Sequence, residues 1–192
     1  MGKEAKANGD VRHLDHFVVP VMDATRAEKF YTDVLGARTL KYENSPGTTR
    51  VFMKLGANHV GLFSQGQATL PNRQSVHSFP RHSFQIPAGE YDSMLARVRR
   101  AGAFARDIKS ELGASCTWTQ GIVFKDSEGN FFEISAAGDI TEPRLHHLHF
   151  DTIDLKASVD FYRRFLNCDV LQHDDAMAAV AVGSGQCIIL NQ

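Results

Sequence analysis

An internal repeat constrains the fold more than any other feature of the sequence. The segment LDHFVVPVMD, which begins at Leu14, and the segment LHHLHFDTID, which begins at Leu145, share leucine, histidine and aspartate in register. A weaker copy, RHSFQIP, begins at Arg81. Self-similarity of this kind indicates that one supersecondary unit is used several times. We therefore predict a fold built from three copies of one unit.

The three copies share a spacing that predicts where a helix ends. The residue 20 positions after the histidine of each copy is Gly36, Gly102 or Asn167. Glycine and asparagine adopt the left-handed conformation that closes a helix most easily. Apolar residues with helical spacing precede each of these positions, and in the first copy they are Ala27, Phe30, Tyr31, Val34 and Leu35.

Segments with the alternation of strands follow each predicted helix, separated by glycine turns. The unit is therefore strand, helix and three strands, and the fold class is α+β. We place the copies at residues 11–65, 81–137 and 144–192, after a flexible tail at residues 1–10. One unit leaves a bare sheet face, so we expect residues 11–137 to close around a shared cavity. The third copy, left unpaired, is expected to form a homodimer.

Composition narrows the possible partners. The 192 residues carry a formal net charge of -1, which argues against a strongly positive nucleic-acid-binding surface. No apolar run approaches the length that spans a bilayer. The three cysteines are widely spaced and lack a CxxC motif, which favours neither a disulfide framework nor a zinc site. We expect a cytoplasmic protein that binds a small molecule, neither a membrane nor nucleic acid.

Strand alternation nominates a metal site in the predicted cavity. His16 and His82 occupy the opening strands of the first two copies, and Glu133 lies in the last strand of the second copy. Two imidazoles and one carboxylate around a divalent ion leave coordination positions open for substrate or dioxygen. Because Glu133 lies on a strand that reads as buried, it needs an ion or a basic partner. The alternative to a metal is a salt bridge to Arg81.

These segments resemble the vicinal-oxygen-chelate superfamily, which includes glyoxalase I, extradiol dioxygenases, fosfomycin-resistance proteins and bleomycin-binding proteins. The stretches that carry the resemblance are LDHFVVPVMDATRAEKFYTDVLG, RHSFQIP and VFKDSEGNFFEIS. The resemblance implies paired βαβββ modules, with His16, His82 and Glu133 as metal ligands. Gly61 matches a frequent fourth ligand position and has no side chain. The likeness is therefore to the three-ligand sites of dioxygenases and fosfomycin-resistance proteins.

The sequence departs from extradiol dioxygenases where those proteins carry an acid–base histidine, because residues 115–118 read Ser-Cys-Thr-Trp. His59, two residues before Gly61, is the candidate substitute as a catalytic group. Trp118 and Phe131 are candidate pocket residues that would stack on an aromatic ligand, and ordinary packing explains them equally well.

The resemblance implies a mononuclear divalent-metal enzyme acting on a small oxygen-bearing molecule. The expected metal is Fe²⁺, with Mn²⁺, Zn²⁺ or Ni²⁺ as alternatives, and it would act as a Lewis acid. Ring-cleaving dioxygenase chemistry is the leading interpretation. The alternatives are a glyoxalase-type lyase or isomerase, a fosfomycin-resistance-type transferase, and a non-catalytic protein that sequesters its ligand.

The third copy contains a second histidine cluster, formed by His146, His147 and His149. The position expected to supply a ligand from the last strand of this copy is Ile188. No further unit with a histidine and a glutamate follows it in this sequence. We therefore interpret the third copy as lacking a metal site.

Overall fold

A computed structural model describes residues 11–64, 81–102, 105–108 and 121–192. The first repeat contains β1 (His16–Val21), α1 (Ala24–Asp33), β2 (Arg38–Ser45), β3 (Thr48–Leu55) and β4 (Asn58–Ser64). The second contains β5 (Arg81–Pro87), α2 (Ala88–Arg100), β6 (Ala105–Ile108), β7 (Gly121–Lys125) and β8 (Phe131–Ala137). The third contains β9 (Arg144–Asp151), α3 (Leu155–Phe165), β10 (Val170–His173), β11 (Met177–Gly183) and β12 (Gln186–Asn191). The tail predicted at residues 1–10 lies outside the described residues.

Local sequence signals set the helix ends. Asp23 caps α1 by accepting a hydrogen bond from the backbone N–H of Arg26 at 2.9 Å, and Asp154 caps α3 in the same way. The predicted left-handed residues have positive φ angles of 73° at Gly36, 69° at Gly102 and 51° at Asn167. None of these helices is long and apolar enough to cross a membrane.

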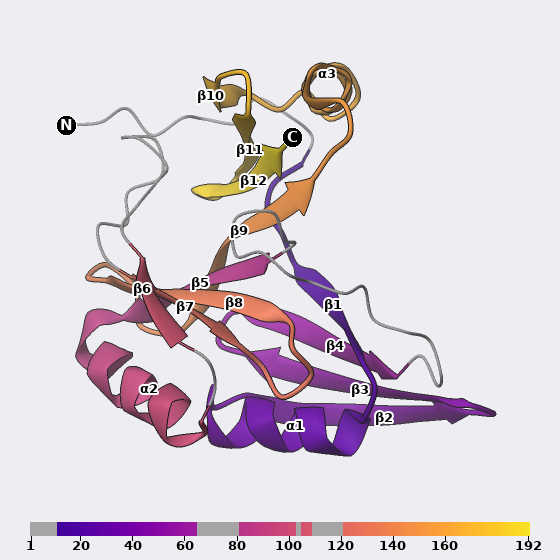
Figure 1. Cartoon of the computed structure of the whole chain (residues 1–192), viewed down its shortest axis with the longest axis vertical. Coiled ribbons are helices and arrows are strands. Elements are labelled where there is room, and N and C mark those ends of the chain that lie inside the picture. The colour runs from indigo at the N-terminus through magenta and orange to yellow at the C-terminus, as the bar shows by residue number, and fades with distance from the viewer. Residues whose placement is uncertain (1–10, 65–80, 103–104, 109–120) are drawn as a thin grey trace.

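The strands form two sheets, which confirms the α+β class. The first sheet has the order β1-β4-β3-β2, and the second is an eight-stranded sheet with the order β10-β11-β12-β9-β5-β8-β7-β6. Figure 1 shows α3 and β10–β12 at the opposite end of the molecule from α1 and α2. The second and third repeats therefore share one continuous sheet.

This pairing differs from the expectation that the first two repeats share a cavity. The opening strands β5 and β9 run antiparallel, with Arg81 opposite His149 and Ser83 opposite His147. Each of these strands would otherwise leave a row of unpaired backbone groups at a sheet edge, and their pairing satisfies both. The third repeat thus finds its partner within the chain. This removes the structural reason for predicting a homodimer through residues 144–192.

The first two repeats instead join through their helix-covered faces. One hydrophobic core contains side chains from both repeats, including Phe17 and Tyr31 from the first and Phe84 and Phe132 from the second. The ring centroids of Tyr31 and Phe132 lie 5.6 Å apart in an edge-to-face arrangement. The faces of the two sheets that the helices do not cover therefore point away from each other.

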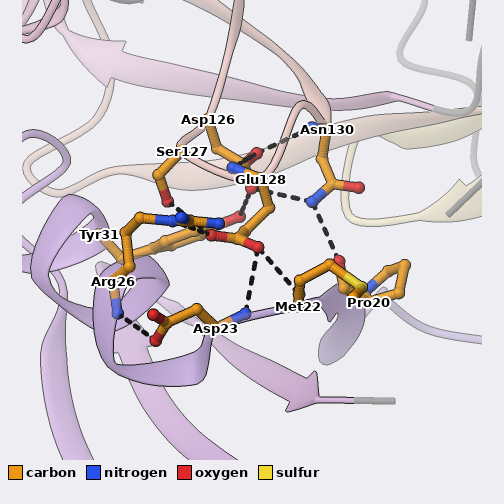
Figure 2. A network of polar contacts seen from close by, with 9 residues as sticks. All are labelled: Pro20, Met22, Asp23, Arg26, Tyr31, Asp126, Ser127, Glu128 and Asn130. Carbon is orange, nitrogen blue, oxygen red and sulfur yellow. Dashed lines mark hydrogen bonds and ion pairs between the residues drawn. The ribbon is translucent and has the colours of Figure 1, made fainter. Parts of the chain in front are cut away.

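A polar network at the turn between β7 and β8 fixes the same interface (Figure 2). The Glu128 carboxylate accepts hydrogen bonds from the backbone N–H groups of Met22 at 2.8 Å and Asp23 at 3.2 Å. It also pairs with the Arg26 guanidinium at 2.7 Å. These contacts join the turn of the second repeat to the start of α1.

The buried Asp126 is the second carboxylate of this network. It accepts hydrogen bonds from the Tyr31 hydroxyl at 3.0 Å and from the Asn130 backbone N–H at 2.8 Å. The Asn130 side chain donates to the backbone carbonyl of Pro20 at 3.1 Å. Figure 2 shows how these bonds run from the turn to β1 and α1. The interface between the repeats is thus both apolar and specifically hydrogen-bonded.

Candidate metal centre

Two of the expected metal ligands, His82 on β5 and Glu133 on β8, lie on opposite faces of the second sheet. These strands are parallel, with His82 opposite Phe132 and Ser83 opposite Glu133. Because successive side chains on a strand point to opposite faces, His82 and Glu133 face opposite sides of the sheet. They cannot meet at one ion in this arrangement.

Core packing determines the face that His82 occupies. Phe84 and Ile86, two and four residues further along β5, are each only 1% exposed in the core. The His82 ring joins them on this face, with its centroid 4.3 Å from that of Phe17 and 5.2 Å from that of Phe132. His82 is therefore part of the packing between the first two repeats.

His16 and His59 lie on the first sheet, apart from Glu133 on the second. They are opposite each other on β1 and β4, and both side chains are exposed. Asp15 lies 3.0 Å from Nδ1 of His16 and 3.9 Å from Nδ1 of His59. Gly61 is opposite Val18 on the same pair of strands. The structure thus groups His16, His59 and Gly61 but does not place them with Glu133.

The remaining residues that the sequence places in the pocket are Phe131 and Trp118. Phe131 is two residues from Glu133 on β8 and therefore shares its face of the sheet. The Lys125 ammonium lies over the Phe131 ring, 4.9 Å from its centroid. Trp118 lies outside the described residues.

A β-bulge on β9 brings two neighbouring histidines together. Leu145 is opposite Phe84, and His147 is opposite the adjacent Ser83, so His146 is an extra residue in the ladder. A bulge of this kind bends the strand and redirects side chains. Here Nδ1 of His146 lies 2.7 Å from Nδ1 of His147. Leu145 is consequently in the core, while His147 faces Glu133.

Glu133, His147 and His149 form a compact cluster in the eight-stranded sheet. Among the described residues, this is the one group of three such side chains whose potential ligand atoms all lie within 4.8 Å of one another. Nε2 of His147 is 3.1 Å from Oε2 of Glu133, and Nε2 of His149 is 3.8 Å from Oε1. All three residues are at most 3% exposed. Neither His16 nor His82 belongs to the group.

Arg81 is the fourth residue of the cluster and supplies a positive charge. Its Nε forms an ion pair with Oε1 of Glu133, which confirms the salt bridge considered from the sequence. The Arg81 side chain is 13% exposed, against 2% for that of Glu133. The side chain of Arg81 is therefore the most exposed to solvent of the four.

The charges around Glu133 decide its protonation. Burial alone would raise its pKa, but the hydrogen bond from His147 and the positive charge of Arg81 hold that pKa well below its usual value. Burial lowers the pKa of His149 well below the usual range for histidine. Burial, together with the nearby His147 and Arg144, lowers the pKa of His146 to about 3. At neutral pH the site thus offers an ionised carboxylate beside the neutral imidazoles of His146 and His149.

The donor set fits a divalent cation. Both ring nitrogens of His149 and the hydroxyls of Ser83 and Ser135 have no hydrogen-bond partner in the described part of the chain. Buried polar atoms normally have such partners, so this one sheet face carries several unused donors and acceptors. Two imidazoles and a carboxylate are ligands for Fe²⁺, Mn²⁺, Zn²⁺ or Ni²⁺. These residues could therefore hold one such ion.

Apolar side chains border the cluster on the third-repeat side. Cys187 is opposite His147 and Ile189 is opposite His149 in the β9–β12 pairing. Both form a small buried cluster with Ala179. An apolar border and burial lower the local dielectric constant, which strengthens electrostatic interactions within the site.

The sequence contained a signal for the two histidines but not for their partner. The alternation His147, Leu148, His149 places both imidazoles on one strand face. The sequence predicts no metal site here, because Ile188 occupies the expected ligand position in the last strand of the third repeat and no further unit with a histidine and a glutamate follows. The carboxylate instead comes from the second repeat, through the β5–β9 pairing.

A comparison with protein families matches residues 13–134 to the Glyoxalase/Bleomycin resistance protein/Dioxygenase superfamily. This match spans more than half of the chain, including all described strands of the first two repeats except the end of β8.

Solved structures share the fold at low sequence identity. A Bacillus subtilis protein provisionally described as a dioxygenase has a TM-score of 0.76 and 16% identity, over 95% of this chain and 64% of that one. Maize (Zea mays) glyoxalase I has a TM-score of 0.69 and 20% identity, over 94% of this chain and 67% of that one. The fosfomycin resistance protein FosX from Listeria monocytogenes, complexed with Mn(II) and sulfate, has a TM-score of 0.50 and 15% identity, over 65% of this chain and 92% of that one. The chain thus spans less than two thirds of the length of the Bacillus protein.

Proposed function

Because the chain belongs to the Glyoxalase/Bleomycin resistance protein/Dioxygenase superfamily, we propose that it is a divalent-metal enzyme acting on a small oxygen-bearing molecule. Glu133, His147 and His149 are the proposed ligands of a single ion. The observation that carries the proposal is the grouping of their ligand atoms within 4.8 Å on one buried sheet face. This set replaces the trio of His16, His82 and Glu133.

The bound ion would act as a Lewis acid toward substrate oxygens. The protein residues hold and orient the ligands. His146, with its pKa lowered to about 3, is neutral at pH 7 and can accept a hydrogen bond through Nδ1 from the neighbouring His147 ring. Such a bond orients a ligating imidazole and fixes its tautomer. The other nitrogen of His147, Nε2, faces Glu133.

Ring cleavage by a dioxygenase is the reaction we propose to test first. Two histidines and one carboxylate with open positions are the ligand set of many oxygen-activating Fe²⁺ sites. The fold similarity to the Bacillus protein described provisionally as a dioxygenase supports the same choice. The similarity to maize glyoxalase I makes a lyase or isomerase reaction the second assay. FosX, solved with Mn(II), supports including Mn²⁺ among the ions tested.

Metal analysis tests the site before any substrate is known. We expect the purified chain, loaded anaerobically with Fe²⁺, Mn²⁺, Zn²⁺ or Ni²⁺, to retain one ion per molecule. Glu133→Gln and His147→Gln each remove a ligand and should lower the affinity by about tenfold or more. His16→Ala and His173→Ala are matched controls on exposed histidines and should leave the affinity unchanged. The affinity is measured by calorimetry and the metal content by elemental analysis.

Two results would contradict this assignment. If the wild-type chain binds none of the four ions, the metal proposal fails. If His16→Ala abolishes binding and His147→Gln does not, the ligands are those expected from the sequence. The Fe²⁺-loaded chain is then screened with catechols under air, where formation of a yellow ring-cleavage product supports dioxygenase activity.

A further inference from the structure

One carboxylate oxygen of Glu133 is already engaged by a cation from the protein. Oε1 forms the ion pair with Arg81 and lies 3.8 Å from Nε2 of His149, while Oε2 lies 3.1 Å from Nε2 of His147. An ion bound by Glu133, His147 and His149 would therefore approach the guanidinium that holds the same carboxylate. Two positive charges this close repel each other strongly in a buried site.

Burying Glu133 without a cation would be costly, because an uncompensated buried charge is among the most destabilising changes in a protein. The guanidinium of Arg81, which forms an ion pair with Oε1 of Glu133, is always positively charged in a protein. Arg81 therefore supplies the positive charge that makes the buried carboxylate tolerable when no metal is present. A divalent cation in the same place would supply it instead.

We propose that Arg81 is an exchangeable counter-ion of Glu133, which neutralises the carboxylate in the metal-free protein and is displaced when a divalent cation binds. This inference rests on the proposed function. Arg81 lies at the start of β5, and its side chain is the least buried of the four. Its long side chain allows the guanidinium to move toward solvent while the backbone stays in the ladder. The displaced guanidinium then lies beside the metal, where it suits an anionic oxygen of a bound ligand.

The proposal makes Arg81 an antagonist of metal binding, which distinguishes it from a residue that merely supports the site. Zn²⁺ is the probe, titrated calorimetrically into the full chain freed of metal. Arg81→Met removes the competing charge, so we expect Zn²⁺ to bind about tenfold or more tightly than to the wild type. Arg81→Lys keeps the charge and should show no such gain. Arg50→Met, which removes one charge from β3 in the other sheet, should bind Zn²⁺ as the wild type does.

Thermal unfolding provides an independent readout. Metal-free Arg81→Met should unfold at a lower temperature than the wild type because Glu133 has lost its counter-ion. Saturating Zn²⁺ should then raise its unfolding temperature by more than it raises that of the wild type. A structural role alone would lower the unfolding temperature without tightening the binding of Zn²⁺.

A measurement on the wild-type chain covers the case in which Arg81→Met does not fold. The ¹⁵Nε–¹Hε signal of Arg81 should shift in step with the addition of one equivalent of Zn²⁺, since the ion pair is broken. Zn²⁺ binding with an unchanged Arg81 signal, or with equal or weaker affinity in Arg81→Met, overturns the inference and leaves the proposed function standing. If neither the wild type nor Arg81→Met binds Zn²⁺, Mn²⁺, Fe²⁺ or Ni²⁺, the proposed function itself fails.

Discussion

Two buried carboxylates in this protein are stabilised in different ways. Glu133 is surrounded by Arg81 and two histidines, which hold its pKa well below the usual value despite burial. Asp126 receives hydrogen bonds from neutral donors, and burial raises its pKa. Charged neighbours favour the ionised form, whereas neutral donors only offset part of the cost of desolvation. This difference makes Glu133 suited to bind a cation and Asp126 suited to a structural role.

The buried Tyr31, which donates a hydrogen bond to Asp126, makes the free energy of unfolding depend on pH. Its hydroxyl donates to Asp126, and burial raises its pKa well above the usual 10.0. Above pH 10 the unfolded chain loses the Tyr31 proton while the folded chain retains it, so stability falls as pH rises. At pH 8 we expect Tyr31→Phe to lower the free energy of unfolding by about 1–2 kcal/mol. This difference should shrink by about 1.4 kcal/mol per pH unit above pH 10.

Urea unfolding of the wild type and Tyr31→Phe between pH 8 and pH 11 measures the effect. The titration of all other groups is shared by the two proteins and cancels in the difference. A difference that stays constant over this range would show that the Tyr31 hydroxyl does not retain its proton through burial.

At the scale of secondary-structure elements, a turn and a β-bulge fix the positions of side chains that strand alternation alone does not determine. The turn between β7 and β8 places Glu128 over the start of α1, and the bulge on β9 turns His147 toward Glu133. Both are local departures from regular structure that a pattern of apolar residues does not encode.

The Glu128 turn should contribute measurably to stability. Glu128→Ala leaves the backbone N–H groups of Met22 and Asp23 and the Arg26 guanidinium without this acceptor. We expect the free energy of unfolding to fall by about 1–2 kcal/mol, measured by urea denaturation. The matched control is Ser127→Ala, which removes a contact of 3.5 Å to the same carboxylate and should cost less than about 0.5 kcal/mol. Equal effects of the two variants would contradict the role of Glu128.

At the scale of the whole molecule, the decisive feature is the union of the second and third repeats in one sheet. Gln85 and Arg144 are directly opposite in the β5–β9 ladder, and Nε of Arg144 donates to Oε1 of Gln85 at 2.8 Å. Opposed residues of antiparallel strands lie at a Cα separation that a disulfide can bridge. We therefore expect Gln85→Cys with Arg144→Cys to form an intramolecular disulfide on oxidation, detected by mass spectrometry.

This experiment is carried out with Cys116, Cys168 and Cys187 replaced by alanine. The control, Gln85→Cys with Val18→Cys, joins different sheets and should stay reduced. A cross-link formed only between two chains would restore the homodimer through residues 144–192.

The sequence by itself determined the features that depend on neighbouring residues. The recurrence of Leu14 and His16 at Leu145 and His147 predicted repeated units, and the left-handed Gly36, Gly102 and Asn167 marked where the helices end. The need for a cation beside Glu133 also followed, since a carboxylate on a buried strand requires one. The helix ends could be predicted in this way because they are set by local backbone sterics.

Only the tertiary structure decided which repeats pair and which histidines meet Glu133. Any of the opening strands could in principle join at an edge, and the strand pattern is the same for each choice. Packing of Phe84 and Ile86 turned His82 into the core, and the β5–β9 pairing brought His147 and His149 to Glu133. The physical reason is that edge pairing and core packing are settled between segments distant in the chain, where local patterns carry no information about the partner.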